Sequence, residues 1–481
     1  MLKVLYVTAE LFPLVKTGGL ADVSAALPPV LRWLGVDARL CLPGYPVLLS
    51  TIPDLVEVMN LGAAYGCENV RILRGQTPET GVPIYLVDAP ELFDRPGNPY
   101  FGPDGHLWHD NHKRFALFGW AAAHLRDNLE GWRFDVLHAQ DWHAGLACAW
   151  LRAMGDPAKS VFTIHNLAYQ GNFTGDTFPD LNLPQDFFSI HGLEFYGKVS
   201  FMKAGLYYAN WISTVSPNYA KEIQTSEHGY GLEGLLRHRQ DCLVGILNGV
   251  DYEVWNPSDD PTLPHTYTQK NAESKQLNKA VLQAALDLEM SPTAPLFCVI
   301  SRLTSMKGLD MVAEATDEIV KQGGQLVVIG QGDNELEARF RELALLYPQS
   351  VATYIGYQEN ISHLVLASSD CLVMPSRSEP CGLTQLYAMK YGTIPLVCRV
   401  GGLADTVVDA TSDKRLKGLA TGFVFKENHL PSLMDAIDRS FMLYRDERAW
   451  TRLQRAAMGQ NFSWQQSGRR YLELYNRAHS E

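Results

Sequence analysis

Short apolar runs alternate with amphipathic stretches along most of the chain, and polar or glycine-containing loops separate them. The first apolar run, residues 4–7, leads through a glycine loop into a helical pattern at 21–34. Further buried-type strands are predicted at residues 38–42, 84–87, 135–138, 160–164 and 211–215. Continuous β-branched runs between helices are typical of a parallel sheet that is covered on both faces.

The pattern changes near residues 247–257, and the polar, proline-containing stretch at 257–271 is predicted to be a linker or a surface crossing. A second strand–helix series follows. Its predicted strands are 296–300, 325–329, 371–374 and 394–397, and its predicted helices include 308–321 and 382–391. The sequence therefore predicts an α/β protein with two doubly wound, Rossmann-like domains. Ligands in such sheets bind beyond the carboxyl ends of the strands, so we expect the two domains to face a cleft lined by strand-to-helix loops.

The composition of the chain disfavours several classes of function. A length of 481 residues with 46% hydrophobic residues suits two globular domains. The formal net charge of -12 disfavours binding to nucleic acid or to an anionic membrane, because both are negatively charged. No apolar run approaches the roughly 20 residues that span a bilayer, and the amino-terminal run is expected to be a strand rather than a signal peptide.

The eight cysteines form no CxxC pair and no metal-ligand spacing. This usage is typical of a reducing compartment, so a cytoplasmic location and the absence of a metal site are predicted.

One candidate anion site is the loop around Lys16, Gly18 and Gly19, which follows the first strand. Two glycines allow a ligand to approach the backbone, and N–H groups at a helix start attract anions. The loop matches neither the dinucleotide-binding nor the Walker pattern. A tight turn with an exposed lysine explains the local pattern equally well.

Arg302 and Lys307 form a counterpart in the second series, between the strand at 296–300 and the next helix. Together the two cations are suited to neutralising a diphosphate leaving group. The alternative is a surface pair beside a helix start.

Glu379 precedes a glycine that is predicted to open a helix. Its carboxylate is suited to accepting hydrogen bonds from sugar hydroxyls, and nearby backbone N–H groups are candidates for phosphate binding, namely those of Gly382, Leu383 and Thr384. The alternative is that Glu379 only favours the helix start. Cys381 is a weak candidate nucleophile, because no histidine lies near it in sequence.

Other polar residues stand where predicted strands end, which is where ligands are usually contacted; they are His165, Asn166, Asn248, Asp141, Trp142 and Tyr357. The alternative for His165 is a purely structural role. Asp141 and Trp142 could instead be a helix cap and a core tryptophan, and Tyr357 could be a buried side chain. No Asp-x-Asp, HExxH or GxSxG motif is present.

Several of these stretches occur together and in a consistent order from residue 16 to about 407; they are KTGGLADV, LHAQDWHAGL, TIHNLAYQG, TVSPNYA, GILNGVDYEVWNP, SRLTSMKG and PSRSEPCGLTQLYAMKYGTIPLV. In this combination the chain resembles bacterial glycogen synthases and plastid starch synthases. The resemblance implies a GT-B glycosyltransferase that moves glucose from ADP-glucose to the non-reducing 4-OH of an α-1,4-glucan such as glycogen or a maltooligosaccharide. It implies retention of configuration, no metal and no cofactor.

The resemblance also implies a division of the chain. Residues 1–248 would form the acceptor-side domain, 249–459 the ADP-glucose domain, and 460–481 a helix that crosses back onto the first domain. Oligomeric state and regulation are not indicated by the sequence.

Residue roles follow from the same resemblance. Lys16 would meet the donor, Arg302 and Lys307 the diphosphate, and Glu379 the sugar, while the backbone carbonyl of His165 would face the anomeric carbon. Asp141, Trp142 and Asn166 would lie on the acceptor side. Asn248 and Tyr357 would line the donor pocket, the latter beside adenine. Many related retaining enzymes carry a second glutamate eight residues after the first, where this chain has Tyr387.

Three alternatives remain open at this point. They are a related transferase that uses UDP-glucose or another acceptor, a glucan-binding protein without activity, and a sugar-phosphate epimerase on the same two-domain fold.

Overall fold

The computed structural model describes residues 1–126, 129–356 and 358–480. The chain divides into unit 1, Met1–Gly249 with Trp464–Glu481, and unit 2, Val250–Ser463. We expected the first boundary one residue earlier and the second after residue 459. The second lies later because the stretch before Trp464 stays on unit 2, where the N–H of Val250 donates to the carbonyl of Phe462 at 2.7 Å.

Within the described residues, unit 1 contains a nine-stranded sheet in the order β12-β11-β7-β6-β1-β2-β5-β4-β3. The strands from β12 to β5 in this order run parallel. Their bounds are β1 (Lys3–Val7), β2 (Asp37–Pro43), β5 (Pro83–Asp88), β6 (Val136–Gln140), β7 (Lys159–Ile164), β11 (Trp211–Thr214) and β12 (Leu243–Gly245).

The strands predicted for this unit all run parallel, and the sheet also has an antiparallel edge that was not predicted. Strands β3 (Val56–Asn60) and β4 (Arg71–Gln76) are antiparallel to their neighbours. Both strands are partly exposed, in contrast to the buried central strands. A short connection between β4 and β5 also permits a hairpin, whereas a parallel pair would need a longer crossover. A separate small sheet, β8 (Asn172–Thr174), β10 (Lys198–Ser200) and β9 (Glu194–Phe195), was not predicted.

The strand order identifies where a ligand should bind in unit 1. The chain passes from β1 through α1 (Gly19–Trp33) to β2, and from β6 through α5 (Asp141–Ala153) to β7, so the two crossovers run in opposite directions along the sheet. Because such crossovers are right-handed, the two helices lie on opposite faces. The carboxyl ends of β1 and β6 therefore form a topological switch point, which is the usual ligand position.

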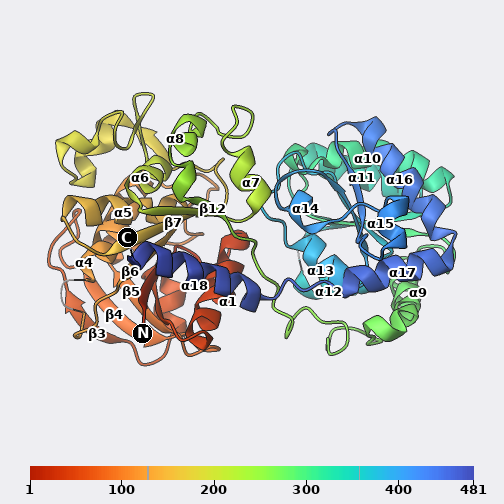
Figure 1. Ribbon diagram of the computed structural model, residues 1–481, viewed down its shortest axis with the longest axis horizontal. Helices are drawn as coiled ribbons and strands as arrows, with labels where there is room; N and C mark the ends of the chain where they lie inside the picture. Colours follow the sequence, from red (N-terminus) through yellow and green to blue (C-terminus); the bar gives the residue numbers. More distant parts are fainter. Residues whose placement is uncertain (127–128, 357, 481) are drawn as a thin grey trace. The chain divides into compact units, whose positions relative to one another are not determined.

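Helix α18 (Trp464–Ser480) belongs to unit 1 and lies beside α1, as Figure 1 shows. Its Tyr475 hydroxyl is 2.8 Å from Nδ1 of the buried His138 on β6. The other helices of the unit are α2 (Pro46–Thr51), α3 (Pro90–Phe93), α4 (Asn111–His124), α6 (Phe201–Tyr208), α7 (Pro217–Glu222) and α8 (Glu233–His238), with the 3₁₀ helices η1 (Gly175–Leu181), η2 (Gln185–Phe187) and η3 (Gln240–Cys242).

Unit 2 contains a parallel sheet of six strands within the described residues, in the order β15-β14-β13-β16-β17-β18. The strand bounds are β13 (Leu296–Ile300), β14 (Gln325–Gly330), β15 (Val351–Ile355), β16 (Cys371–Met374), β17 (Ile394–Cys398) and β18 (Phe423–Phe425). The chain leaves β13 toward β14 and leaves β16 toward β17, in opposite directions, so the switch point lies between β13 and β16.

Helices on both sides cover the sheet of unit 2; they are α9 (Lys275–Ala285), α10 (Leu309–Lys321), α11 (Asn334–Leu346), α12 (Glu359–Ser368), α13 (Thr384–Lys390), α14 (Gly401–Thr406), α15 (Ser412–Leu416), α16 (Leu430–Tyr444) and α17 (Glu447–Met458), with η4 (Gln269–Ser274) and η5 (Ser305–Lys307). No helix of the described residues in either unit is both long and apolar enough to cross a membrane.

The stretch at 257–271 is not the surface linker that its composition predicts. It has little regular structure, yet it packs on the core of unit 2 and buries Asp260, Leu263 and Tyr267. The hydroxyl of Tyr267 donates to the carbonyl of Tyr391 at 2.7 Å. The polar residues of this stretch make tertiary hydrogen bonds to residues that are distant in sequence. A local sequence pattern does not reveal those partners.

Candidate active site

The loop after β1 is held by a buried carboxylate that the sequence analysis missed. Glu10 is only 3% exposed and accepts hydrogen bonds from the N–H groups of Thr17 and Gly18 at 2.8 and 3.2 Å. The hydroxyls of Thr17 and Tyr100 also donate to it, at 2.5 and 2.7 Å. Four donors on one buried carboxylate fix the shape of the loop that carries Lys16. An acidic residue three positions after a buried strand was the available sequence signal.

The N–H of Gly18 is therefore used within the loop, and anion binding by the N–H groups at the start of α1 stays a prediction. Lys16 lies near the same loop, with Nζ 2.8 Å from Oδ1 of Asp22 and 4.7 Å from the centre of the Phe12 ring. Both partners of the ion pair are partly exposed, so solvent screens it.

The two glycines of this loop are not required by the fold itself. A Cβ atom at Gly18 or Gly19 would meet no other atom within 4 Å, and neither residue has the left-handed φ that favours glycine. Open space at both positions is compatible with close approach of a ligand to the backbone.

Asp141 and His165 meet at the carboxyl ends of β6 and β7. Oδ1 of Asp141 accepts the backbone N–H of His165 at 2.9 Å, and Nε2 of His165 is 2.8 Å from Oε1 of Gln140. Asp141 itself has a left-handed φ of 55° at the start of α5, which directs the chain sharply from strand to helix. Asp141 and His165 were predicted as site residues from the sequence, whereas Gln140 was not.

Burial sets the charge of these groups. It raises the pKa of Asp141 to about 7, although backbone N–H groups of His165 and Asn166 act in the opposite direction. Burial also lowers the pKa of His165 to about 3, so the imidazole is neutral at pH 7. The interior of this switch point thus carries little fixed positive charge.

Trp142, expected on the acceptor side, is 9% exposed and lies in an aromatic cluster. Its ring centre is 4.9 Å from that of Phe115 and 6.0 Å from that of Tyr100. A Cβ at Gly171 would overlap the indole at 2.3 Å. The structure therefore resembles the core-tryptophan alternative more than an open sugar platform.

Two asparagines differ in their hydrogen bonding. Oδ1 of Asn166 accepts the N–H of Ala168 at 3.0 Å, which closes a local turn. Asn248 is 6% exposed, and within the described residues its Oδ1 has no hydrogen-bond partner. A buried amide oxygen without a partner is costly, so it marks a position where a ligand donor would be stabilising.

At the switch point of unit 2, Nζ of Lys307 lies 2.6 Å from Oε2 of Glu379, and both side chains are largely buried. The hydroxyl of Ser376 donates to the same carboxylate oxygen at 3.1 Å. The loops after β13 and β16, which are distant in sequence, are thus joined by one ion pair.

Glycines make this pairing possible. Gly308 has a φ of 69°, and a Cβ there would lie 2.1 Å from the carbonyl oxygen of Pro375, so the two loops meet only with glycine at this position. A Cβ at Gly401 would lie 1.9 Å from the carbonyl oxygen of Glu379, and the N–H of Gly402 donates to that oxygen at 3.1 Å. These contacts fix the backbone of Glu379.

Arg302 lies in the loop after β13 and is exposed. Its guanidinium makes no ion pair or hydrogen bond with the residues that the structure describes. Tyr357, expected beside a nucleotide base, lies outside the described residues.

The helix predicted from Gly382 begins two residues later, at Thr384. Gly382 has a φ of 71°, which is not helical, and Leu383 precedes the first turn without a side-chain cap. The helix is short, so phosphate binding by the N–H groups of Gly382, Leu383 and Thr384 stays a prediction.

No cluster of three or more histidine, cysteine, aspartate or glutamate side chains in the described residues is arranged to hold a metal ion.

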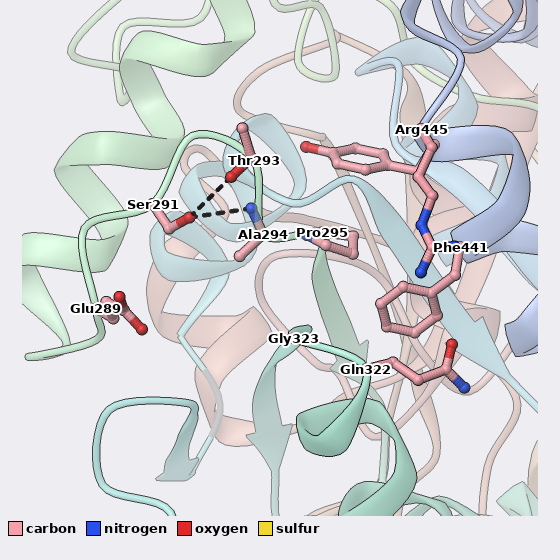
Figure 2. A pocket seen from close by; sticks show the side chains of 10 residues that line it. Glu289, Ser291, Thr293, Ala294, Pro295, Gln322, Gly323, Phe441 and Arg445 are labelled. Carbon is pink, nitrogen blue, oxygen red and sulfur yellow. Dashed lines mark hydrogen bonds between the residues drawn. The ribbon is translucent and has the colours of Figure 1, made fainter.

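A pocket of about 280 Å³ in unit 2 lies away from these residues. Figure 2 shows Ser291 and Thr293 on one wall and Phe441 and Arg445 on another. Pro295, in the same lining, directly precedes β13, so the pocket is at the amino ends of the strands. It is therefore not part of the switch point.

Comparisons with known proteins match both units. Residues 3–238 match the family model described as the starch synthase catalytic domain, and residues 287–456 match that of glycosyl transferases group 1. The glycogen synthases of Serratia proteamaculans and Yersinia pestis are each 50% identical to this chain over 479 residues, which cover 99% of it and 100% of each relative.

Solved structures give the same result. The catalytic domain of starch synthase IV from Arabidopsis thaliana, bound to ADP and acarbose, matches with a TM-score of 0.89 and 30% identity over 100% of both chains. Sucrose-phosphate synthase from Thermosynechococcus elongatus matches with a TM-score of 0.61 and 17% identity over 100% of both chains, which supports the fold alone.

Proposed function

We propose that this chain, which belongs to the glycogen synthase and starch synthase family of glycosyltransferases, transfers glucose from ADP-glucose to the non-reducing 4-OH of an α-1,4-glucan. The fold is the two-domain GT-B fold of that family. The donor and the acceptor are the specific part of the proposal. Both are supported by the glycogen synthase relatives and by the ADP and acarbose bound in the starch synthase IV structure.

One observation carries the proposal: the Lys307–Glu379 ion pair at the switch point of unit 2, with Arg302 exposed in the same loop as Lys307. A diphosphate that binds Lys307 and Arg302 takes the place of a carboxylate as the partner of Lys307. Glu379 is then able to accept hydrogen bonds from hydroxyls of the glucose. The same side chains thus serve both halves of a nucleotide sugar.

Unit 1 supplies neutral groups that suit a sugar, together with the cation of Lys16. In the described part of the chain no hydrogen bond is made to the carbonyl oxygen of His165, and the buried Oδ1 of Asn248 also has no donor. We assign the first to the anomeric carbon and the second to the donor pocket. Lys16, with open space beside Gly18 and Gly19, is assigned to the donor phosphates, and Asp141 with Asn166 to the acceptor side.

The proposed reaction breaks the bond between C1 of glucose and the β-phosphate oxygen and forms a bond from C1 to O4 of the glucan on the same face. Negative charge that develops on the diphosphate is stabilised by Arg302 and Lys307, and positive charge at C1 by the His165 carbonyl dipole. The departing phosphate oxygen takes the proton of the acceptor hydroxyl, so no separate base is needed. A glucosyl adduct trapped on Glu379 would contradict this path.

Transfer of radiolabelled glucose from ADP-glucose to glycogen tests the proposal. The wild-type chain should incorporate label, and Lys307→Ala and Glu379→Ala should each lose roughly 100- to 1,000-fold in turnover, the usual effect of deleting one electrostatic contact to a transition state. Lys417→Ala is a matched control, because Lys417 forms a highly exposed ion pair with Asp413 in the same unit. Unchanged turnover in both site variants would overturn the assignment.

Competition between ADP-glucose and UDP-glucose in the same assay establishes the donor. Preferential transfer from UDP-glucose would replace the donor in the proposal and leave the transferase site in place. A cytoplasmic location, expected from the cysteine usage, stays a prediction.

A further inference from the structure

Trp255 lies between two other rings in unit 2. Its ring centre is 3.9 Å from that of Tyr387, with an angle of 2° between the planes, and 3.8 Å from that of His363, with an angle of 16°. The indole is 8% exposed. Parallel contact on both faces means that neither neighbouring ring can shift sideways without losing overlap with the indole.

The two outer rings come from two helices of this unit, α13 and α12. Tyr387 belongs to α13, and its N–H donates to the carbonyl of Leu383 at 3.0 Å, so one helical turn separates the stacked ring from the loop of Glu379. His363 belongs to α12, which follows the loop after β15. The three-ring stack of Tyr387, Trp255 and His363 therefore joins α12 to α13, the helix that follows the Glu379 loop.

Trp255 itself comes from the segment that enters unit 2. The chain passes into this unit at Val250, and the N–H of Trp255 donates to the carbonyl of Asp251 at 2.8 Å. The hydroxyl of Tyr252 accepts the N–H of Phe462 at 2.9 Å, which ties this segment to the stretch that leaves the unit. The stack thus connects the entry point of the chain with α12 and α13.

The buried carboxylate of Asp260 contacts His363, one of the two outer rings of the stack. Oδ2 of Asp260 is 2.7 Å from Nδ1 of His363 and accepts the hydroxyl of Tyr391 at 2.5 Å. Oδ1 of Asp260 accepts the N–H and hydroxyl of Thr262 at 2.9 and 2.6 Å. His363 is therefore held by the carboxylate of Asp260 at Nδ1 and by stacking on the indole.

We propose that Trp255 is a positioning residue for the donor nucleotide: by stacking between Tyr387 and His363 it holds α13 relative to α12 in the arrangement in which the Glu379 loop binds the nucleotide sugar. The inference rests on the proposed function, because it concerns the same donor site. Trp255 acts through Tyr387 and His363 and is not itself assigned a contact with the donor.

The position explains why a tryptophan is suited here. A smaller apolar side chain would keep the burial but would leave both partner rings with a free face, so α12 and α13 would sample several arrangements. Only a fraction of molecules would then be competent to bind, and the apparent dissociation constant would rise by the inverse of that fraction.

Calorimetric titration with ADP, together with steady-state kinetics on ADP-glucose and maltooligosaccharide, tests the inference on the full chain. Trp255→Leu should raise the dissociation constant for ADP and the KM for ADP-glucose by about tenfold, with the KM for the glucan unchanged. Trp255→Phe retains a flat ring between the partners and should stay within about threefold of wild type.

Trp450→Leu is the matched control. Trp450 is an equally buried tryptophan of unit 2 whose ring partners are Phe423 and Tyr444. It should lower the melting temperature as Trp255→Leu does and leave ADP affinity unchanged. An equal loss of ADP affinity in both variants would show general loosening of the unit and would overturn the positioning role.

ADP affinity equal to wild type in a folded Trp255→Leu variant would also overturn it. If that variant does not fold, His363→Leu answers the same question, because it keeps the indole and removes one stacked face; a rise of about threefold is expected and no change counts against the inference. A wild-type chain that binds no ADP overturns the proposed function as well, so the two failures are distinguishable.

Discussion

The two switch points are built on the same topology and use charge in opposite ways. In unit 1 the buried carboxylates of Glu10 and Asp141 accept backbone N–H groups of nearby loops, and His165 is kept neutral. In unit 2 the buried carboxylate of Glu379 is paired with the ammonium of Lys307.

The site in unit 1 therefore has fixed hydrogen-bond partners, whereas the ion pair in unit 2 can exchange one partner for a ligand. A carboxylate bonded to backbone N–H groups cannot change partners without moving the loop, so the unit 1 site is preorganised. A lysine on a flexible stem can turn from a carboxylate to a phosphate, so the unit 2 site can respond to its ligand. Under the proposed function, the ion pair of unit 2 exchanges its partner for the diphosphate, and the fixed loops of unit 1 position Lys16 and the groups that face the sugar.

A double-mutant cycle on Lys307 and Glu379 should give the largest effect. Each alanine substitution is expected to reduce kcat/KM by roughly 100- to 1,000-fold, and the double variant by much less than the product. The reason is that each single variant leaves the other charge largely buried without its partner. Fully multiplicative losses in the transfer assay would show that the two residues act independently, contrary to the exchange described above.

Glu10→Ala tests whether the unit 1 loop is fixed in advance. Four donors lose their common acceptor, so the loop of Lys16 should become mobile, and the KM for ADP-glucose is expected to rise about tenfold. Glu68→Ala, at an exposed glutamate of the same unit, is the control for steady-state kinetics. A Glu10→Ala enzyme with wild-type KM would mean that the loop is ordered by other contacts.

Asp141→Asn should change the pH dependence of stability more than stability itself. The folded pKa of about 7 lies above the ordinary value of 3.8, so the wild type gains stability from Asp141 in full below pH 3.8 and loses it as the pH rises through 7. The variant should lack this decline, which denaturant unfolding across the pH range will measure. Asp54→Asn, at an exposed position, should retain it. Parallel wild-type and Asp141→Asn curves would show that Asp141 is ionised as in water.

Lys275→Met is expected to have the smallest effect on transfer activity, and it tests whether functional charge in unit 2 is confined to the switch point. Burial lowers the pKa of Lys275 to about 7 from the ordinary 10.5, so the wild type loses stability as the pH falls from 10.5 to 7. The variant should lose this dependence while transfer activity stays unchanged. Reduced activity in a folded variant would extend the functional charge into the core.

The sequence predicted the strands that matter most for the site. The bounds of β13 and β16 match the predicted 296–300 and 371–374, because continuous apolar runs have one stable placement, in the middle of a covered parallel sheet. The residues immediately after those strands then had to lie at the carboxyl edge. This is why Arg302, Lys307 and Glu379 could be named in advance.

Other features depended on contacts that local patterns do not encode. Glu10 was missed, because its four donors come from a loop and from Tyr100, ninety positions away. The stretch 257–271 was mistaken for a linker, since the partners that bury it, His363 and Tyr391, lie more than a hundred residues further on. The start of α13 was placed two residues early, because the left-handed φ of Gly382 was not visible in the sequence.

The sequence by itself determined the central parallel strands of both sheets, the loops that follow them at each switch point, and the family. The tertiary structure alone decided which charges meet, since Lys307 and Glu379 are 72 positions apart and pair only when Gly308 lets one loop lie against Pro375. It also decided that Trp255 is stacked on both faces. Periodicity and propensity act over a few residues, whereas a pair of charges or rings is brought together only when the whole sheet has formed.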